Sequence, residues 1–445
     1  MLKRPFSQVF PLLIPFYIFM GSYTHLLGQK VKSGPMVGYS QMREVLVWVQ
    51  LDQQAEVQLQ YWPHGEKKES AHISQKVNTS AGTAFVAKLL ADSVQPGIQY
   101  SYEIVINGKP QSFDYETTFE SQTLWQHRTD PPNFRLALGS CTYINEKKYD
   151  RPKKPYGGDY GIFESIYEDS ANLMLWLGDN IYLREPDWFT KTGIYHRYTD
   201  FRSLPELQPL WANTHHYAIW DDHDFGPNNA DRSFPFKHLT KEAFELFWGN
   251  PEVAQDFGIN SFFQWNDMDF FLLDNRWNRS PNNRITGDRQ LLGKDQIEWL
   301  IDLLKYSRAP FKFVAVGGQV VSDAAKYENH AIFPEEREYL LNRIAAEKIK
   351  GVVFLTGDRH HTELSSTTIN NVLIYDLTIS PLTSGSAGDR ALDEGNTNRV
   401  EGTYVGDRNY GIIDFSGTYR NREMHIQVKN SDGKLLWDKT IEQPE

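Results

Sequence analysis

The sequence is poor in cysteine, and this scarcity limits its chemistry from the outset. Cys141 is the only cysteine among 445 residues, so no intramolecular disulfide can form and no lipoprotein cysteine is present near the start. Basic residues are also outnumbered, 46 Lys and Arg against 57 Asp and Glu, which gives a formal net charge of −11. This charge argues against nucleic-acid binding, and it would repel an anionic substrate unless bound cations reversed the local field.

Long apolar runs are missing after the first 29 residues, which excludes a later membrane span. Within residues 1–29, Lys3 and Arg4 give a basic start, and Phe10–Met20 is apolar but too short to cross a bilayer comfortably. We expect an export signal cleaved between Gly21 and Gln29, and hence a periplasmic or secreted protein. The alternative is an uncleaved membrane anchor.

The chain also has no internal repeat of fixed period. Its hydrophobic content of 40% and aromatic content of 14% indicate a globular protein with a large core. The length allows two or three domains. We expect a monomer.

Residues 34–120 have the alternating apolar and polar pattern of β-strands. The clearest strands are 44–50, 57–61 and 100–105, and Asn107-Gly108 is typical of a tight hairpin. Gln95-Pro96-Gly97, placed before two tyrosines, resembles the corner of an immunoglobulin-like or fibronectin-like sandwich. We therefore predict an all-β sandwich domain over residues 30–127, with a linker at 128–133.

From residue 134 the pattern changes to short apolar runs that alternate with helical stretches, as expected of buried strands in a layered α/β fold. Helical spacing is found at 294–304 and 335–347, and each stretch leads into an apolar run, at 311–316 and 352–355. Three further strands, at 410–415, 423–428 and 434–440, are expected to complete a sheet edge. We predict a second domain over residues 134–445.

Apolar runs in this second part end in glycine or acidic residues. Five of them lead into Gly139-Ser140-Cys141, Gly178-Asp179, Asp221-Asp222, Gly317-Gly318-Gln319 and Gly357-Asp358. In open α/β sheets, ligands bind outside the carboxyl ends of the strands, where loops converge. The pattern predicts one site that offers thiolate, phenolate, carboxylate and imidazole groups.

The most concentrated of these tips is the stretch Ala218–Asp231, in which Asp221, Asp222, His223 and Asp224 follow one another. Three carboxylates and an imidazole side by side would be costly to gather unless a cation lay among them. The alternative is a solvated acidic loop, which becomes less plausible because the same design recurs at the other tips.

The single residues at the tips have ordinary explanations as well. Cys141 could be a small buried hydrophobe, and Tyr182 a packing aromatic. Asp358 could form a simple ion pair with Arg359. Of the adjacent His360 and His361, only one is expected to point inward. Their joint placement at strand tips favours metal ligands.

These motifs resemble those of the PhoD-like alkaline phosphatases, a family of the metallophosphoesterase superfamily. The resemblance rests on Gly139-Ser140-Cys141, Gly178-Asp179-Asn180-Ile181-Tyr182, Trp220-Asp221-Asp222-His223-Asp224 with Asn228-Asn229, and Gly357-Asp358-Arg359-His360. It extends through Gly34–Tyr39, Leu273–Arg276 and Leu292–Leu300, and so covers nearly the whole chain after residue 29. It implies a four-layer αββα catalytic domain behind a β-sandwich.

The resemblance also implies two metal ions. Fe³⁺ would be bound by Cys141, Asp179, Tyr182 and His360. Ca²⁺ would share Asp179 and be completed by Asp222 and Asp358. The donor types agree with this division, since imidazole and anionic thiolate and phenolate suit iron whereas carboxylates suit a hard divalent ion.

Three further residues are candidates for catalytic roles. His223, next to a predicted ligand, could stabilise transferred charge or protonate a leaving alkoxide. Asn229 could contact metal or phosphate, although Asn228 is an alternative. Arg276 could bind phosphate or support the sheet from within.

Two loops complete the predicted site. Gln319 stands where the superfamily has a histidine, which argues against a tight ligand from that loop, and His330 is the next histidine along the chain. We expect residues 380–388 to rim the cleft.

The sequence therefore predicts a secreted metal-dependent phosphoesterase in which a metal-bound hydroxide attacks phosphate monoesters, diesters or both. One alternative is a strict phosphodiesterase or phospholipase on the same scaffold. Another is a non-catalytic surface binding protein with a structural metal site, against which the Asp222-His223 pair argues.

Overall fold

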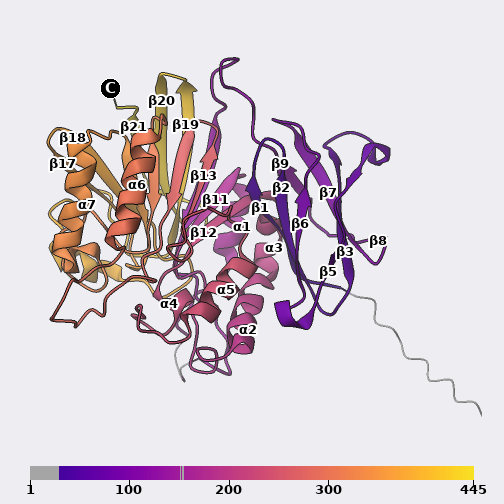
Figure 1. Ribbon diagram of the computed structural model, residues 1–445, viewed down its shortest axis with the longest axis horizontal. Helices are drawn as coiled ribbons and strands as arrows, with labels where there is room; N and C mark the ends of the chain where they lie inside the picture. The colour runs from indigo at the N-terminus through magenta and orange to yellow at the C-terminus, as the bar shows by residue number, and fades with distance from the viewer. Residues whose placement is uncertain (1–29, 151, 153–154, 445) are drawn as a thin grey trace, which may run out of the picture.

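The computed structural model describes residues 30–150, 152 and 155–444, so the predicted export signal, residues 1–29, lies outside the described residues. In the larger part of the molecule two sheets face each other, and helices cover the outer face of each sheet (Figure 1). The predicted α/β fold is confirmed. In the described ranges, no helix is both long enough and apolar enough to cross a membrane.

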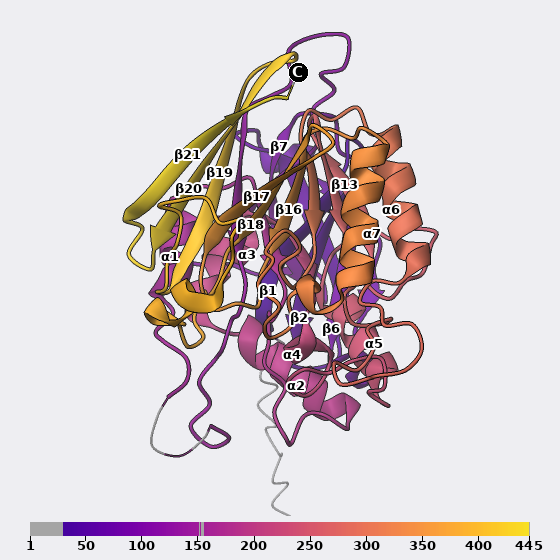
Figure 2. The same ribbon diagram turned by 90° about the vertical axis from the view of Figure 1, so that its left-hand side faces the viewer.

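One of the facing sheets has nine strands in the order β21-β20-β19-β10-β11-β12-β1-β2-β6. The strands are β1 (Val31–Ser40), β2 (Val45–Leu51), β6 (Val86–Ala91), β10 (Phe134–Gly139), β11 (Leu173–Leu177), β12 (His215–Ile219), β19 (Asn409–Thr418), β20 (Asn421–Asn430) and β21 (Leu435–Glu442). Strands β10 to β12 are parallel and almost wholly buried, as their apolar sequences predict. The last three strands form one sheet edge, as predicted (Figure 2).

The N-terminal strands belong to this same sheet. β1 pairs in parallel with β12, with Val37 opposite His215. β2 and β6 then extend the sheet in antiparallel order. The sheet therefore continues across the boundary that the sequence predicts at residues 128–133.

The other facing sheet has six strands in the order β13-β14-β15-β16-β18-β17. Its strands are β13 (Ser261–Trp265), β14 (Met268–Leu272), β15 (Lys312–Ala315), β16 (Val352–Thr356), β17 (Glu363–Ile369) and β18 (Val372–Thr378). Helices α6 (Lys294–Tyr306) and α7 (Pro334–Ala346) cover its outer face, where Leu300 and Leu341 share a core with Val314 (Figure 1). Both helices occupy the stretches where the sequence predicts them.

The outer face of the nine-stranded sheet is covered by helices from the middle of the chain. The helices here are α1 (Gly161–Glu168), α2 (Lys191–Arg202), α3 (Gln208–Asn213), α4 (Asp222–Phe225) and α5 (Lys237–Phe247). Trp176 of β11 contacts Phe163 of α1 and Trp211 of α3. On the inner face, Tyr217 of β12 stacks on Phe263 of β13, with ring centroids 3.7 Å apart. Aromatic packing thus holds both the helices and the second sheet in place.

A third, smaller sheet packs against β1, β2 and β6 (Figure 1). Its strands are β3 (Glu56–Pro63), β4 (His72–Ile73), β5 (Val77–Asn78), β7 (Gln99–Ile106), β8 (Lys109–Pro110) and β9 (Thr118–Glu120). Val47 of β2 and Leu59 of β3 lie in one buried cluster. The predicted hairpin between β7 and β8 is confirmed, with φ +49° at Asn107 and +77° at Gly108.

Short 3₁₀ helices complete the structure. They are η1 (Lys68–Ser70), η2 (Ala81–Thr83), η3 (Pro205–Leu207), η4 (His330–Ile332) and η5 (Gly388–Glu394).

Candidate active site

Four strands place the predicted site residues at neighbouring tips. β10 leads to Cys141, β11 leads to Asp179, β12 leads to Asp222, and β16 of the other sheet leads to Asp358. The two sheets come so close here that a Cβ added to Gly357 would lie 2.5 Å from the carbonyl oxygen of Leu177. The site therefore lies where the carboxyl ends of strands from both sheets converge.

The backbone at these tips adopts an uncommon conformation. Five predicted site residues have positive φ values: Cys141 (+59°), Asp179 (+51°), Asn229 (+60°), Asp358 (+65°) and His360 (+57°). A left-handed backbone is unfavourable for residues with a side chain, and such strain clusters at functional sites. The sharp turns redirect the side chains after the strands have ended.

The four residues predicted to bind iron lie together. Cys141 Sγ is 3.6 Å from Asp179 Oδ2, and the Tyr182 hydroxyl donates to the same oxygen at 3.2 Å. The Tyr182 oxygen also lies 3.3 Å from His360 Nε2. Cys141, Asp179 and His360 each offer a donor atom within 4.8 Å of the other two.

A second group shares Asp179 and extends the site towards β12 and β16. Asp179, Asp222 and His223 each have a potential ligand atom within 4.8 Å of those of the other two. Asp221, Asp222 and Asp358 form another such group. The predicted carboxylates Asp222 and Asp358 are therefore brought together. Asp221 joins them although the sequence analysis did not select it as a ligand.

Asn229 reaches the site through its backbone. Its N–H donates to Asp222 Oδ2 at 2.6 Å, while its side chain is on the exposed part of the loop. Between the two adjacent asparagines, this contact favours Asn229 over Asn228.

Arg276 lies inside the protein rather than in the open site, with an exposed fraction of 0%. Its guanidinium binds Asp221, and Nη2 is 2.6 Å from Glu328 Oε2. Asn275 also donates to Asp221 Oδ1, at 2.8 Å. Of the two roles that the sequence left open, these contacts favour internal support, because the guanidinium is already engaged by carboxylates.

His223 lies over the site with a fifth of its side chain exposed. Its ring packs on Tyr182 with centroids 4.2 Å apart, and Nε2 is 3.9 Å from Asp222 Oδ2. Burial lowers the pKa of His223, and the neighbouring Asp222 carboxylate opposes that shift. An imidazole in this position is suited to exchange a proton near neutral pH.

The electrostatics of the cluster favour a bound cation. Burial, followed by repulsion from Asp222 and other carboxylates, raises the pKa of Asp179 well above its usual value. Burial and repulsion from Asp221 and Asp222 do the same to the pKa of Asp358. A cation among these side chains would replace repulsion with attraction.

Two oxygens in the cluster support the same conclusion. Asp221 Oδ2 and Asp222 Oδ1 are buried and have no hydrogen-bond partner among the described residues. Buried carboxylate oxygens are normally paired, because leaving them unsatisfied is costly. Together with the thiol, phenol and imidazole beside them, they fit a metal centre.

Several contacts could not be selected from the sequence. The Ser380 hydroxyl donates to Cys141 Sγ at 3.2 Å and accepts from the His360 backbone N–H at 3.1 Å. The hydroxyls of Ser384 and Tyr156 lie 3.4 Å from Nε2 and 3.2 Å from Nδ1 of His360, respectively. The prediction that residues 380–388 border the cleft was the only signal for the two serines.

The remaining polar candidates lie behind the site. Gln319 is buried and donates to Glu363 at 2.8 Å, so it is engaged away from the cluster. His330 Nε2 is paired with Glu336 at 3.0 Å. Of the two adjacent histidines, only His360 lies among the candidate ligands, as expected, while His361 faces Glu363.

A layered α/β fold that gathers such donors at its strand tips has the arrangement of a metal-dependent hydrolase. The chain belongs to the PhoD-like phosphatase family, whose model matches residues 136–430. Residues 28–124 match a second model, described as a domain of unknown function (DUF7800). The strand-tip residues all fall within the first of these two matches.

A curated relative is alkaline phosphatase D of Bacillus subtilis (strain 168), which is 22% identical over 357 residues. The match covers 66% of this chain and 59% of the relative, so the chain aligns with somewhat more than half of that protein's length.

Two solved structures share the fold. A structure of PhoD is 17% identical with a TM-score of 0.74, covering 93% of this chain and 92% of its own. The purple acid phosphatase PPD1 from yellow lupin (Lupinus luteus) seeds is 12% identical with a TM-score of 0.66, covering 92% of this chain and 74% of its own. These likenesses show that the chain has the same overall fold as PhoD and this purple acid phosphatase.

Proposed function

We propose that this chain is a metal-dependent phosphoesterase that hydrolyses phosphate monoesters, diesters or both. The observation that carries the proposal is the buried carboxylate cluster of Asp221, Asp222 and Asp358, in which Asp221 and Asp222 each keep an oxygen without a hydrogen-bond partner among the described residues. Membership of the PhoD-like phosphatase family supports phosphate esters as the substrate class. Residues 1–29 would direct the protein to the periplasm or the medium, where it would act as a monomer.

We assign the metals by donor type. Cys141, Asp179, Tyr182 and His360 would bind Fe³⁺, while Asp179, Asp222 and Asp358 would bind Ca²⁺. When bound, the metal ions would activate water and neutralise the charge on the phosphate.

The chain's own residues would then have distinct tasks. His223 would donate a proton to the alkoxide leaving group from its partly exposed position over Tyr182. Asn229 would fix Asp222 through its backbone N–H and present its side chain to the phosphate. Arg276 would hold Asp221 from inside the protein.

We further infer that residues 134–445 form the four-layer αββα metallophosphoesterase domain, to which they contribute the six-stranded sheet, strands β10 to β12 and β19 to β21 of the nine-stranded sheet, and the outer helices. The β-rich residues 30–127 would form an immunoglobulin-like or fibronectin-like sandwich that precedes it. The core shared by β2 and β3 supports the sandwich, and the parallel pairing of β1 with β12 would fix it rigidly to the catalytic part.

A paired assay tests the substrate class. The purified full chain, supplied with iron and calcium, is expected to hydrolyse p-nitrophenyl phosphate, bis(p-nitrophenyl) phosphate or both. Asp179→Asn should abolish either activity because Asp179 belongs to both metal groups. Hydrolysis of the diester alone would identify a strict phosphodiesterase, and hydrolysis of neither would favour a non-catalytic binding protein.

The iron assignment has a spectroscopic test. Thiolate and phenolate ligands of Fe³⁺ should give the oxidised protein a charge-transfer band in the visible range. Cys141→Ser and Tyr182→Phe should each shift or abolish this band. A colourless protein in which elemental analysis finds only zinc would contradict the assignment.

A further inference from the structure

The loop Gly357–Thr362, between β16 and β17, carries two of the proposed ligands in a strained conformation. Asp358 and His360 have φ values of +65° and +57°. Such a conformation is unfavourable for a residue with a side chain, and it persists only where the surrounding structure imposes it. Something outside the loop must therefore hold it.

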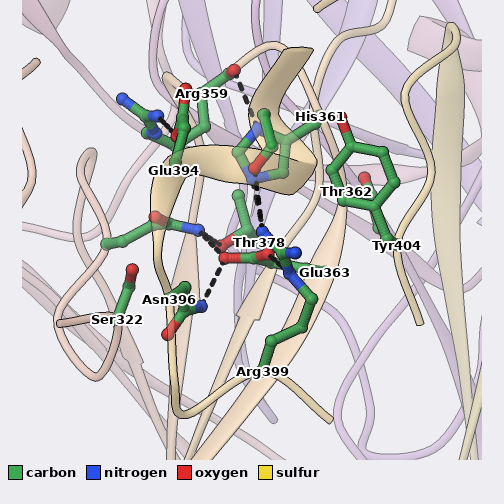
Figure 3. Close-up of polar contacts among 12 residues, drawn as sticks. Ser322, Arg359, His361, Thr362, Glu363, Thr378, Glu394, Asn396, Arg399 and Tyr404 are labelled. Carbon is green, nitrogen blue, oxygen red and sulfur yellow. Dashed lines mark hydrogen bonds and ion pairs between the residues drawn. The ribbon is translucent and has the colours of Figure 1, made fainter. Parts of the chain in front are cut away.

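The two residues that alternate with the ligands, Arg359 and His361, belong to a cluster of polar side chains that also includes Glu363, Glu394 and Arg399 (Figure 3). Arg359 forms an ion pair with Glu394 of η5. His361 is 1% exposed, its Nε2 is 3.6 Å from Glu363 Oε2, and its ring lies 5.3 Å from that of Tyr404. Proposed metal ligands thus alternate along the loop with residues that contact the polar cluster.

Glu363 is the centre of this cluster, and it is 1% exposed. One carboxylate oxygen accepts hydrogen bonds from Gln319 Nε2 at 2.8 Å and Asn396 Nδ2 at 2.7 Å. Arg399 Nε binds the other oxygen, which is the one that faces His361 (Figure 3). Two separate segments, one with Gln319 and one with Asn396 and Arg399, therefore converge on the carboxylate that also faces His361 of the ligand loop.

The charge of Glu363 is maintained despite its burial. Burial alone would raise its pKa, but the neighbouring His361 and Arg399 lower the pKa to about 2. A carboxylate that is ionised throughout the neutral range gives His361 and Arg399 a fixed partner.

We propose that Glu363 is a positioning residue, whose contacts with His361 and Arg399 hold the loop so that Asp358 and His360 face the metals. Glu363 touches neither metal ligand, so its effect passes through the loop. The expected effect of Glu363 on catalysis rests on the proposed function. The placement of the loop, however, can be measured without metal or substrate.

The first variant is Glu363→Gln in the full chain, which keeps the side chain's shape and removes its charge. This change leaves Arg399 partly buried without a counter-charge, which alone could destabilise the protein. The double variant Glu363→Gln/Arg399→Met removes that unpaired charge, so an effect on the loop can be distinguished from a general loss of stability.

The matched control is Glu298→Gln on α6. Glu298 also binds an arginine, with Arg343 Nη2 3.0 Å from Oε2, and it accepts a hydrogen bond from Tyr339. It lies on the partly exposed outer side of the six-stranded sheet. It therefore repeats the chemistry of Glu363 away from the ligand loop.

Hydrogen exchange of the metal-free proteins is the first measurement. In both Glu363 variants the amides of residues 357–362 should exchange about tenfold faster or more, while β16 and β17 keep their protection. The control should match the wild type. Unchanged exchange at 357–362, or acceleration spread equally over β16 and β17, would overturn the positioning role.

Calcium binding, measured by titration calorimetry of the folded proteins with CaCl₂, is the second measurement. Loss of a supporting contact typically weakens metal binding about 10–100-fold, so both Glu363 variants should show that loss while the control does not. A wild type that bound no calcium and hydrolysed no phosphate ester would contradict the proposed function, and the hydrogen-exchange comparison would still decide the role of Glu363. Wild-type calcium affinity in both variants would overturn the proposal.

Discussion

The two ends of strand β12 bury polar side chains in opposite ways. At its start, His215 Nδ1 lies 2.9 Å from the Gly38 carbonyl and Nε2 accepts from the Glu120 N–H at 3.1 Å. Its neighbour His216 is equally satisfied, accepting from Trp176 Nε1 at 3.0 Å. Just past the other end, Asp221 and Asp222 each keep an oxygen without a hydrogen-bond partner in the described chain.

The difference separates side chains whose polar groups are satisfied by the fold from those that the proposed function assigns to a ligand. Burial lowers the pKa of His215 to about 4, so the ring stays neutral and needs no counter-ion. Burial and like charges raise the pKa values of Asp179 and Asp358, so those carboxylates are ionised at low cost only beside a cation. The first arrangement is stable alone, whereas under the proposed function the second is completed by metal.

The largest expected effect comes from His223→Asn, which should break catalysis without breaking the fold. Loss of a general acid should reduce the rate on alkyl phosphates by about 10²–10⁴-fold. The loss should be smaller for aryl phosphates, whose good leaving groups need little protonation. Steady-state kinetics on both substrate classes measures the difference.

Metal analysis of the same variant provides the control. Metal content and thermal stability should stay near those of the wild type if His223 acts only on the leaving group. Loss of metal would instead make His223 a ligand, which its distance to the Asp222 and Asp179 carboxylates allows. An unchanged rate on alkyl phosphates, with metal retained, would exclude the acid role.

Arg202→Met should have the opposite profile, a loss of stability without a loss of catalysis. Arg202 is fully buried between β2 and the outer helices. Its guanidinium lies 4.1 Å from the ring centroid of Trp248 and 5.2 Å from that of Trp48. It also donates a hydrogen bond to the Phe247 carbonyl at 2.5 Å. Losing these contacts should lower the free energy of unfolding by about 2–4 kcal/mol.

The check is chemical denaturation together with kinetics at a temperature where the variant is folded. kcat and KM should remain those of the wild type. A changed KM with unchanged stability would mean that the contacts of Arg202 and the candidate active site are not independent.

A smaller loss of stability is expected at low pH. Burial lowers the pKa of His216 to about 3, far below the 6.5 of a free histidine. The unfolded chain therefore binds more protons between pH 3 and 6.5, and stability must fall as the pH falls through that window. His216 alone should cost about 2–3 kcal/mol between pH 7 and pH 4.5.

His216→Gln isolates this contribution, because a glutamine can keep the hydrogen bonds to Trp176 Nε1 and to the Leu210 carbonyl, each 3.0 Å long, but cannot titrate. Urea denaturation at several pH values should show a shallower loss of stability for the variant than for the wild type. Equal slopes would show that His216 is not the group responsible.

Much of this organisation could be predicted from the sequence, because local signals carry it. The apolar runs before Asp179 and Asp358 indicated strand ends, and the helices at 294–304 and 335–347 followed from their spacing. Cys141 and His360 were selected by motif, and the fold brings them to one place.

Other features could not be predicted, because they depend on contacts between distant segments. The pairing of β1 with β12 joins strands far apart in the chain and leaves no local pattern. Ser380 was not selected because its hydroxyl reaches Cys141 only through the fold. The role of Arg276 could not be predicted for the same reason. An arginine after a strand has the same sequence pattern whether it binds a phosphate or, as here, a buried carboxylate.

Metal dependence tests the central claim most directly. The full chain is treated exhaustively with a strong chelator until elemental analysis shows that the divalent ions are gone, and phosphate ester hydrolysis is then measured. We expect activity to be lost and calcium to restore it best among divalent ions, because Asp222 and Asp358 offer carboxylate oxygens to a hard cation. Full activity after complete removal of the divalent ions would contradict the account.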